Sequence, residues 1–99
     1  MKKINSSQRS YLKSKAHHLN PVIIIGKNGL NEGTIQSINT VLSAQELIKI
    51  KFRDHKGNKR DLSQKIVAET SSILINMIGH VLILFREHDD IDKRKYKLP

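Results

Sequence analysis

The spacing of hydrophobic residues along the chain predicts seven secondary-structure elements in the order α-β-α-β-α-β-β. Four consecutive branched aliphatic residues, Val22–Ile25, predict a fully buried strand, because a half-exposed strand would alternate with polar residues. Leu47–Phe52 (LIKIKF) does alternate. It therefore predicts a strand with its isoleucines and phenylalanine on one face and Lys49 and Lys51 on the other.

Two further strands form a predicted hairpin in the last third of the chain. Ile73–Ile78 and Val81–Phe85 are separated only by Gly79-His80, a two-residue turn in which glycine can adopt a positive φ. Both strands are apolar on both faces, so part of the second face of the sheet must be covered. We expect the first helix to provide that cover.

Three predicted helices connect the strands, at about residues 6–17, 31–43 and 61–72. Ser6 or Ser7 is a suitable N-cap for the first helix, and Asp61 for the third. The second helix presents one apolar face, made of Ile35, Ile38, Val41 and Leu42.

Together these elements predict an α/β (α+β type) fold. Because crossover helices join parallel strands, we expect a two-layer sandwich with a mixed four-stranded sheet and right-handed crossovers. A chain of 99 residues forms one domain with a modest core, which we place at residues 1–86. The polar residues 87–99 are expected to form a flexible tail.

The charge of the chain favours a polyanionic partner. Eighteen Lys and Arg residues face nine Asp and Glu, for a net charge of +9, and residues 1–31 contain no acidic residue. Nucleic acid is the first candidate partner and an anionic membrane the second, against the alternative of a domain that is merely basic. The chain has no cysteine and no apolar run long enough to span a bilayer, so we expect a soluble cytoplasmic monomer.

A short loop supplies a candidate phosphate-binding site. Gly26, Lys27, Asn28 and Gly29 lie between the first strand and a helix that starts near Asn31. Glycines allow a nucleic-acid backbone to approach closely, and a helix start presents unpaired N–H groups and a positive dipole end. Lys27 adds a mobile charge. The alternative for this pattern taken alone is a plain strand-to-helix turn.

Further cations occur at regular spacing elsewhere. Arg9, Lys13 and His17 follow one flank of the first helix at i, i+4 and i+8, without a carboxylate partner on that helix. Lys49 and Lys51 share one sheet face. Each group is either an ordinary solvent-exposed face or part of an anion-binding surface.

These features resemble the CRM domain, in particular its small stand-alone bacterial form, the YhbY-like RNA-binding proteins. The matching stretches are AHHLNPVIIIGKNGLNEGTIQSI at positions 16–38, ELIKIK at 46–51 and IGHVLILFR at 78–86, and the terminal KYKLP is also similar. The resemblance extends over nearly the whole chain, roughly residues 6–86.

The resemblance implies a fold similar to the C-terminal domain of translation initiation factor three and an RNA-binding loop analogous to that of KH domains. Family members of this size are associated with precursors of the large ribosomal subunit, and plant relatives with intron splicing. Gly26–Gly29 would then contact RNA backbone, the basic residues of the first helix would form a flanking surface, and ribosomal RNA would be the partner. The acidic stretch 87–90 departs from the more basic tail expected and leaves the role of the tail open.

Competing functions receive less support from the sequence. We expect no enzyme, since the chain contains no Gly-x-Ser-x-Gly elbow, no P-loop and no Gly-x-Gly-x-x-Gly. No metal or other cofactor is predicted, because the five histidines are scattered or adjacent and Asp89, Asp90 and Asp92 lack the glycine and distal glutamate of a calcium loop. The remaining alternative is a protein–protein interaction module that uses an apolar sheet face.

Overall fold

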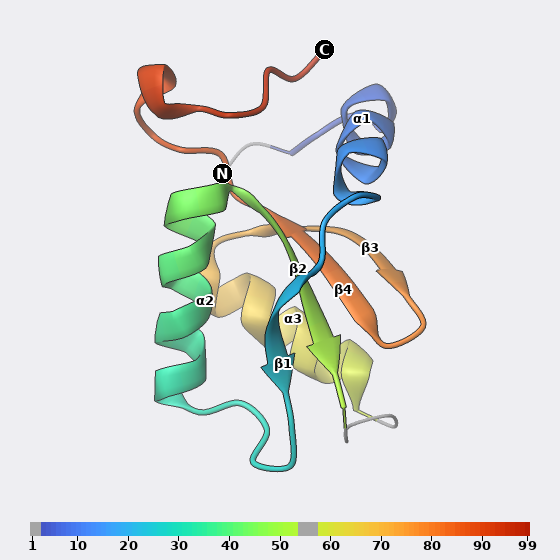
Figure 1. The fold of residues 1–99 in the computed structure, drawn as a ribbon, viewed down its shortest axis with the longest axis vertical. Helices are drawn as coiled ribbons and strands as arrows, with labels where there is room; N and C mark the ends of the chain where they lie inside the picture. The colour runs from blue at the N-terminus through green and yellow to red at the C-terminus, as the bar shows by residue number, and fades with distance from the viewer. Residues whose placement is uncertain (1–2, 54–57) are drawn as a thin grey trace.

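The computed structural model describes residues 3–53 and 58–99, and the order of its elements confirms the predicted pattern (Figure 1). The elements are α1 (Ser6–Ala16), β1 (Pro21–Ile25), α2 (Glu32–Gln45), β2 (Leu47–Phe52), α3 (Lys59–Thr70), β3 (Ile73–Ile78), β4 (Val81–Phe85) and a short 3-10 helix, η1 (Ile91–Lys93).

The four strands form one mixed sheet in the order β1-β2-β4-β3. β1 pairs parallel with β2, and β4 lies antiparallel between β2 and β3. β3 therefore runs in the same direction as β1 and β2, as the crossover through α3 requires. The two central strands are β2 and β4, and the edges are β1 and β3.

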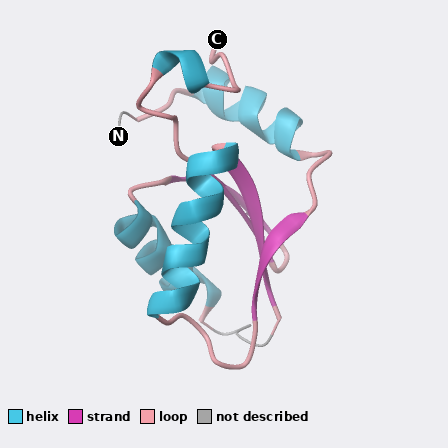
Figure 2. Ribbon diagram, turned by 60° about the vertical axis from the view of Figure 1, so that its left-hand side comes forward, coloured by secondary structure: helices cyan, strands magenta, loops and turns pink. Residues whose placement is uncertain are grey.

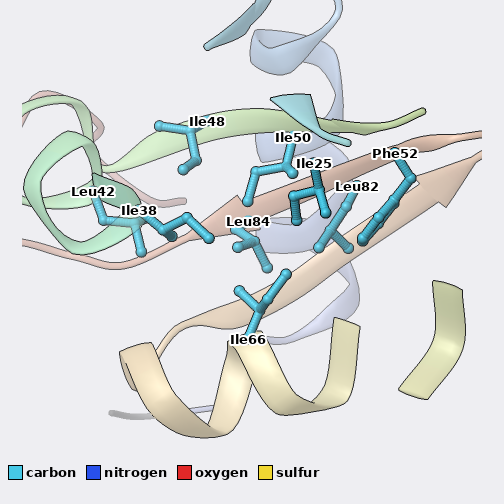
Figure 3. Close-up of a cluster of buried hydrophobic side chains, with 9 residues drawn as sticks. All are labelled: Ile25, Ile38, Leu42, Ile48, Ile50, Phe52, Ile66, Leu82 and Leu84. Carbon is cyan, nitrogen blue, oxygen red and sulfur yellow. The ribbon is translucent and has the colours of Figure 1, made fainter. Parts of the chain in front are cut away.

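The main core lies between one face of the sheet and the helices α2 and α3 (Figure 3). All three predicted apolar residues of β2 point into this core, and α2 and α3 supply residues at helical spacing. Its buried members are Ile25, Ile38, Leu42, Ile48, Ile50, Phe52, Ile66, Leu82 and Leu84.

A second cluster, here called the α1 core, lies on the opposite face of the sheet. It joins Leu12 and Ala16 of α1 to buried residues of three strands, namely Leu47, Ile75, Ile83 and Phe85. α1 therefore provides the cover expected for that face, and it adds a partial third layer to the predicted two-layer sandwich. Figure 2 shows α1 at one end of the sheet, so the rest of this face has no helix over it among the described residues.

β1 differs from the sequence prediction of a fully buried strand. Val22 is 41% exposed and Ile24 is 51% exposed, whereas Ile25 is buried in the main core and Ile23 packs partly against it. The reason is position: β1 is an edge strand, and α1 covers the other end of the second face. An uninterrupted aliphatic run therefore does not imply burial on both sides here.

Two helix starts also differ from the prediction. Asn5, one residue before the expected caps, forms a capping box in which its side chain accepts a hydrogen bond from the Gln8 N–H and the Gln8 side chain accepts one from the Asn5 N–H. α3 begins at Lys59, so Asp61 lies in its first turn rather than at the cap. Residues 54–57 of the preceding polar loop lie outside the described residues.

Residues 87–99, expected to be a flexible tail, instead fold back onto the body. The buried carboxylate of Glu46, a residue with a positive φ of 65°, accepts hydrogen bonds from the backbone N–H groups of His88 and Lys95. Tyr96 and Leu98 pack against the α1 core. Burial raises the pKa of the Tyr96 phenol, and the nearby Glu46 carboxylate and Tyr11 raise it further.

The exposure difference within β1 leads to a stability prediction. Ile25→Ala should lower the free energy of unfolding by about 2–4 kcal/mol, because it leaves a cavity in the main core. Ile24→Ala should cost less than about 1 kcal/mol, since half of that side chain already faces water. Urea unfolding of both variants followed by circular dichroism measures the difference, and equal costs would contradict the edge position of β1.

Candidate nucleic-acid interface

The loop Gly26–Gly29 forms a tight turn at the end of β1. The Gly29 N–H donates to the Gly26 carbonyl oxygen at 3.0 Å, and Gly29 has a φ of +65°, which favours glycine. Lys27 and Asn28 at the tip are exposed. A Cβ atom built on Gly26 would meet no atom within 4 Å, so a ligand backbone has room to approach there.

The loop leads directly into the start of α2. Asn31 is the N-cap, and its side-chain oxygen accepts hydrogen bonds from the N–H (2.9 Å) and the hydroxyl (3.1 Å) of Thr34. Glu32 occupies the first turn, where it complements the helix dipole and competes with a bound anion. The positive charge of this region therefore depends on Lys27 more than on the helix end.

The sheet face turned away from α2 and α3, here called the open face, joins apolar and basic side chains in rows across the strands. The strand register places Ile24 beside Lys51, Lys51 opposite Val81, and Val81 opposite Ile78. Ile24 and Ile78 are 51% and 63% exposed, and Lys51 is also exposed. Because Ile24 precedes the buried Ile25 and then Gly26, this row adjoins the loop.

The next row lies closer to α1. Lys49 is opposite Ile83, which is opposite Asn76 on β3. The Lys49 ammonium group donates to the Leu19 carbonyl oxygen at 3.0 Å, which ties β2 to the segment between α1 and β1. Counting the described residues, one of its three N–H groups is used in this way, which leaves two for another acceptor.

A groove of about 650 Å³ runs between α1 and the open face, and we call it the α1 groove. Lys13, His17 and Lys49 line it together with Asn76 and Ile78. The structure thus brings two of the three predicted α1 cations to the same side of the molecule as the two predicted sheet lysines.

Arg9 does not share this position. One nitrogen of its guanidinium group, Nη1, donates to the carbonyl oxygens of Leu74 (2.6 Å) and Ile75 (2.8 Å). The strand register shifts between Leu74 and Asn76, and Arg9 binds the carbonyl groups at this irregularity on the edge strand β3. Arg9 therefore anchors α1 to the sheet, in contrast to the exposed cation expected from the sequence.

Sequence reasoning did not single out Arg53, which lies close to the loop. Its backbone N–H donates to the Ile25 carbonyl oxygen at 2.9 Å, and the residue is exposed. The available signal was its place directly after β2, which runs parallel to β1. Lys59 is held elsewhere, because its ammonium group bonds the Gly79 carbonyl oxygen and His80 Nδ1.

The charged side chains described on the open face are all positive. Neither the α1 groove nor the two rows contain a carboxylate among the described residues. The acidic side chains described nearby occupy other places: Glu32 begins α2, Asp61 lies in the first turn of α3 and Glu46 is buried beneath the C-terminal segment. Within residues 3–53 and 58–99, an anion on the open face would therefore meet lysines without a competing acid.

Residues 3–53 and 58–99 form neither of two other classes of site, a metal centre or a membrane-spanning helix. No group of three or more His, Cys, Asp or Glu side chains in this part of the chain is arranged to hold a metal ion. Likewise, none of the described helices has the length and apolar character needed to cross a membrane.

Comparison with known proteins identifies relatives over the whole chain. Residues 4–86 match the CRS1 / YhbY (CRM) domain. An RNA-binding protein of Haemophilus influenzae is 38% identical over 100% of this chain and 98% of its own length, and the Bacillus subtilis probable RNA-binding protein YqeI is 33% identical over 97% and 99%. The solution structure of a Staphylococcus aureus protein, described as a candidate RNA-binding protein, has a TM-score of 0.80 and 32% identity, covering 98% of this chain and 100% of that one.

The contrast between Arg9 and Lys13 can be tested by stability. Arg9→Ala removes two short hydrogen bonds and leaves two strand carbonyl groups without this donor, so it should cost about 1–3 kcal/mol of unfolding free energy. Lys13→Ala, four residues further along α1, removes an exposed side chain and should change stability by less than about 0.5 kcal/mol. Thermal unfolding measures both variants, and an Arg9 variant as stable as the parent would refute the anchoring role.

Proposed function

The chain belongs to the CRS1/YhbY (CRM) domain family, and we propose that it is a non-enzymatic protein that binds ribosomal RNA during assembly of the large ribosomal subunit. Its relatives in Haemophilus influenzae and Bacillus subtilis are named as RNA-binding proteins. The ribosomal part of this proposal is supported by the family resemblance alone, and the cytoplasm is the compartment in which such a chain would act.

The observation that carries the proposal is the position of Lys51. Its row on the open face joins the loop Gly26–Gly29 to a surface that holds further lysines and no carboxylate among the described residues. Over the part of the surface that the structure describes, a polyanion can therefore contact the loop and the sheet without crossing an acidic region. A nucleic-acid backbone is a polyanion long enough to contact both.

In this proposal the loop and the lysines have different tasks. Gly26 and Gly29 let the sugar-phosphate backbone approach the main chain, while Lys27 neutralises a phosphate at the tip. Asn28 can donate or accept a hydrogen bond. Lys49, Lys51 and Lys13 supply charge along the adjoining surface, with His17 at its margin. These contacts position the RNA, and they do not by themselves read its sequence.

A second candidate function is supported by the exposed apolar side chains. Val22, Ile24 and Ile78 are each more than 40% exposed and lie on the edge strands β1 and β3. Such a surface is typical of a protein–protein contact. On a ribosomal particle both modes of binding can operate together, so their salt dependence is the property that separates them.

The role of the loop can be tested by charge reversal. We expect the double variant Lys27→Asp with Asn28→Asp to lower RNA affinity at least about tenfold, because it removes one cation and places two carboxylates where phosphate would lie. Both side chains are exposed, so the melting temperature should stay nearly unchanged. Fluorescence anisotropy with a ribosomal RNA fragment measures the affinity.

The matched control changes the charge by the same amount on the outer surface of α3. Gln64→Glu with Lys65→Glu alters two exposed residues there and should weaken binding much less than the loop variant. Arg60→Ser is a milder control in the first turn of α3. A loop variant that binds as tightly as the parent would show that Gly26–Gly29 is only a turn.

Salt dependence separates the two candidate functions. If four to six phosphates are neutralised, the logarithm of the binding constant should fall against the logarithm of salt concentration with a slope of about −3 to −4. A flat response would favour the protein-interaction module.

In cell extract the protein should sediment with immature large ribosomal subunits at low salt and leave them at high salt. Sedimentation only at the top of a low-salt gradient would contradict the ribosomal assignment.

A further inference from the structure

The α1 groove is lined by both cationic and apolar side chains, so it is suited to a ligand that is partly anionic and partly apolar. From its geometry we infer that it binds an unpaired base of single-stranded RNA, with Asn76 as the residue that contacts the edge of the base. This inference rests on the proposed RNA-binding function and adds to it the kind of RNA and the place where a base is read.

The lining of the groove supports a nucleotide as the occupant. Ile78 is 63% exposed and offers an apolar surface, and Lys13 and Lys49 carry positive charge beside it. A volume of about 650 Å³ lies within the range of about 300–1,000 Å³ that small-molecule sites occupy. The faces of a base are apolar while its phosphate is anionic, so one nucleotide satisfies both parts of this surface.

Asn76 has the geometry of a base-reading residue. Its side-chain oxygen accepts a hydrogen bond from the Met77 N–H at 3.0 Å, which assigns the oxygen and leaves the NH₂ group as a donor. That NH₂ group has no hydrogen-bond partner in the part of the chain that the structure describes. The register shift between Leu74 and Asn76 places Ile75 in the α1 core and Asn76 in the groove. Irregular strand pairing of this kind often directs a side chain toward a site.

The available rings argue against binding by a flat sheet platform. RNA-binding sheets of the common type stack bases on exposed aromatic side chains, but both phenylalanines here, Phe52 and Phe85, are buried. The rings at the groove are those of His17 and His18, which meet edge to face at 5.3 Å between centroids. A base would therefore be held at the groove, between histidine rings and aliphatic side chains, rather than across the sheet.

The same features favour a single strand over a duplex. In an A-form helix the bases are stacked and their edges lie in a deep, narrow major groove that side chains cannot read, whereas an unpaired base can turn outward into a protein groove. Lys51 lies between the loop Gly26–Gly29 and the groove, in the row next to that of Lys49. The phosphates of one strand can thus follow the lysines while a base enters the α1 groove.

The test compares base preference and strandedness. Anisotropy titrations at one salt concentration would use eight-nucleotide homopolymers of A, C, G and U and a duplex of equal length. We expect the parent protein to bind single strands at least about fivefold tighter than duplex and to prefer one or two bases by a similar factor. Asn76→Ala should abolish that preference while changing affinity for the weakest homopolymer less than about twofold.

A second variant, a control variant and a spectroscopic measurement keep the test decisive. Asn76→Asp retains an acceptor for the Met77 N–H but removes the donor, so it should also lose the preference even if Asn76→Ala is poorly folded. Asn58→Ala, an exposed residue without a side-chain capping bond, is the control that should behave as the parent. In the parent, the side-chain amide signal of Asn76 should shift in nuclear magnetic resonance spectra on titration with the preferred strand.

Tight RNA binding that depends on the loop but is unaffected at Asn76, or equal affinity for duplex and single strands, would overturn this inference and leave the proposed function standing. Absence of binding to any RNA would overturn both.

Discussion

The alternation of side chains on β2 is the constraint on which the rest of the molecule depends. β2 is paired on both sides, and it sends Ile48, Ile50 and Phe52 into the main core while Lys49 and Lys51 face the other way. A shift of one residue in its register would bury two ammonium groups and expose three apolar side chains, at a cost no small domain could offset. The alternation of β2 thus determines both the hydrophobic core and the basic open face, and a change in its register would alter both.

Much of the fold could be predicted because its determinants are local. Helical spacing in α2, strict alternation in β2 and the short Gly79 turn each specify an element without reference to the rest of the chain. β1 shows a property that local sequence does not predict. Four aliphatic residues predict a strand correctly, but burial depends on strand order and on which part of the face α1 covers, and these follow from long-range packing. The docking of residues 87–99 depends in the same way on distant groups, namely the Glu46 carboxylate and the α1 core.

In the candidate site, too, the features set by local sequence could be predicted and those set by long-range packing could not. The loop and its lysine could be predicted from the sequence, because two glycines with this spacing after a strand indicate a tight turn of the backbone. The separate roles of Arg9 and Asn76 were not readable, because both depend on the shift in pairing between β3 and β4. Arg9, Lys13 and His17 are equivalent by spacing on α1, yet Arg9 binds strand carbonyl groups while the other two line the groove. Periodicity locates a helix flank but does not identify which of its side chains the sheet will engage.

The contacts of α1 also have a consequence for the order in which the protein forms during synthesis. The main core joins segments between Ile25 and Leu84, whereas α1 also obtains partners near the far end of the chain. Arg9 bonds carbonyl groups 65 and 66 positions away, and the Gln8 side chain bonds the carbonyl oxygen of Pro99, 91 positions away. Closing such long loops is slow relative to local pairing. The full set of α1 contacts can therefore form only after residue 99 has been translated, whereas the turn of the loop Gly26–Gly29 is closed by a hydrogen bond within the loop itself.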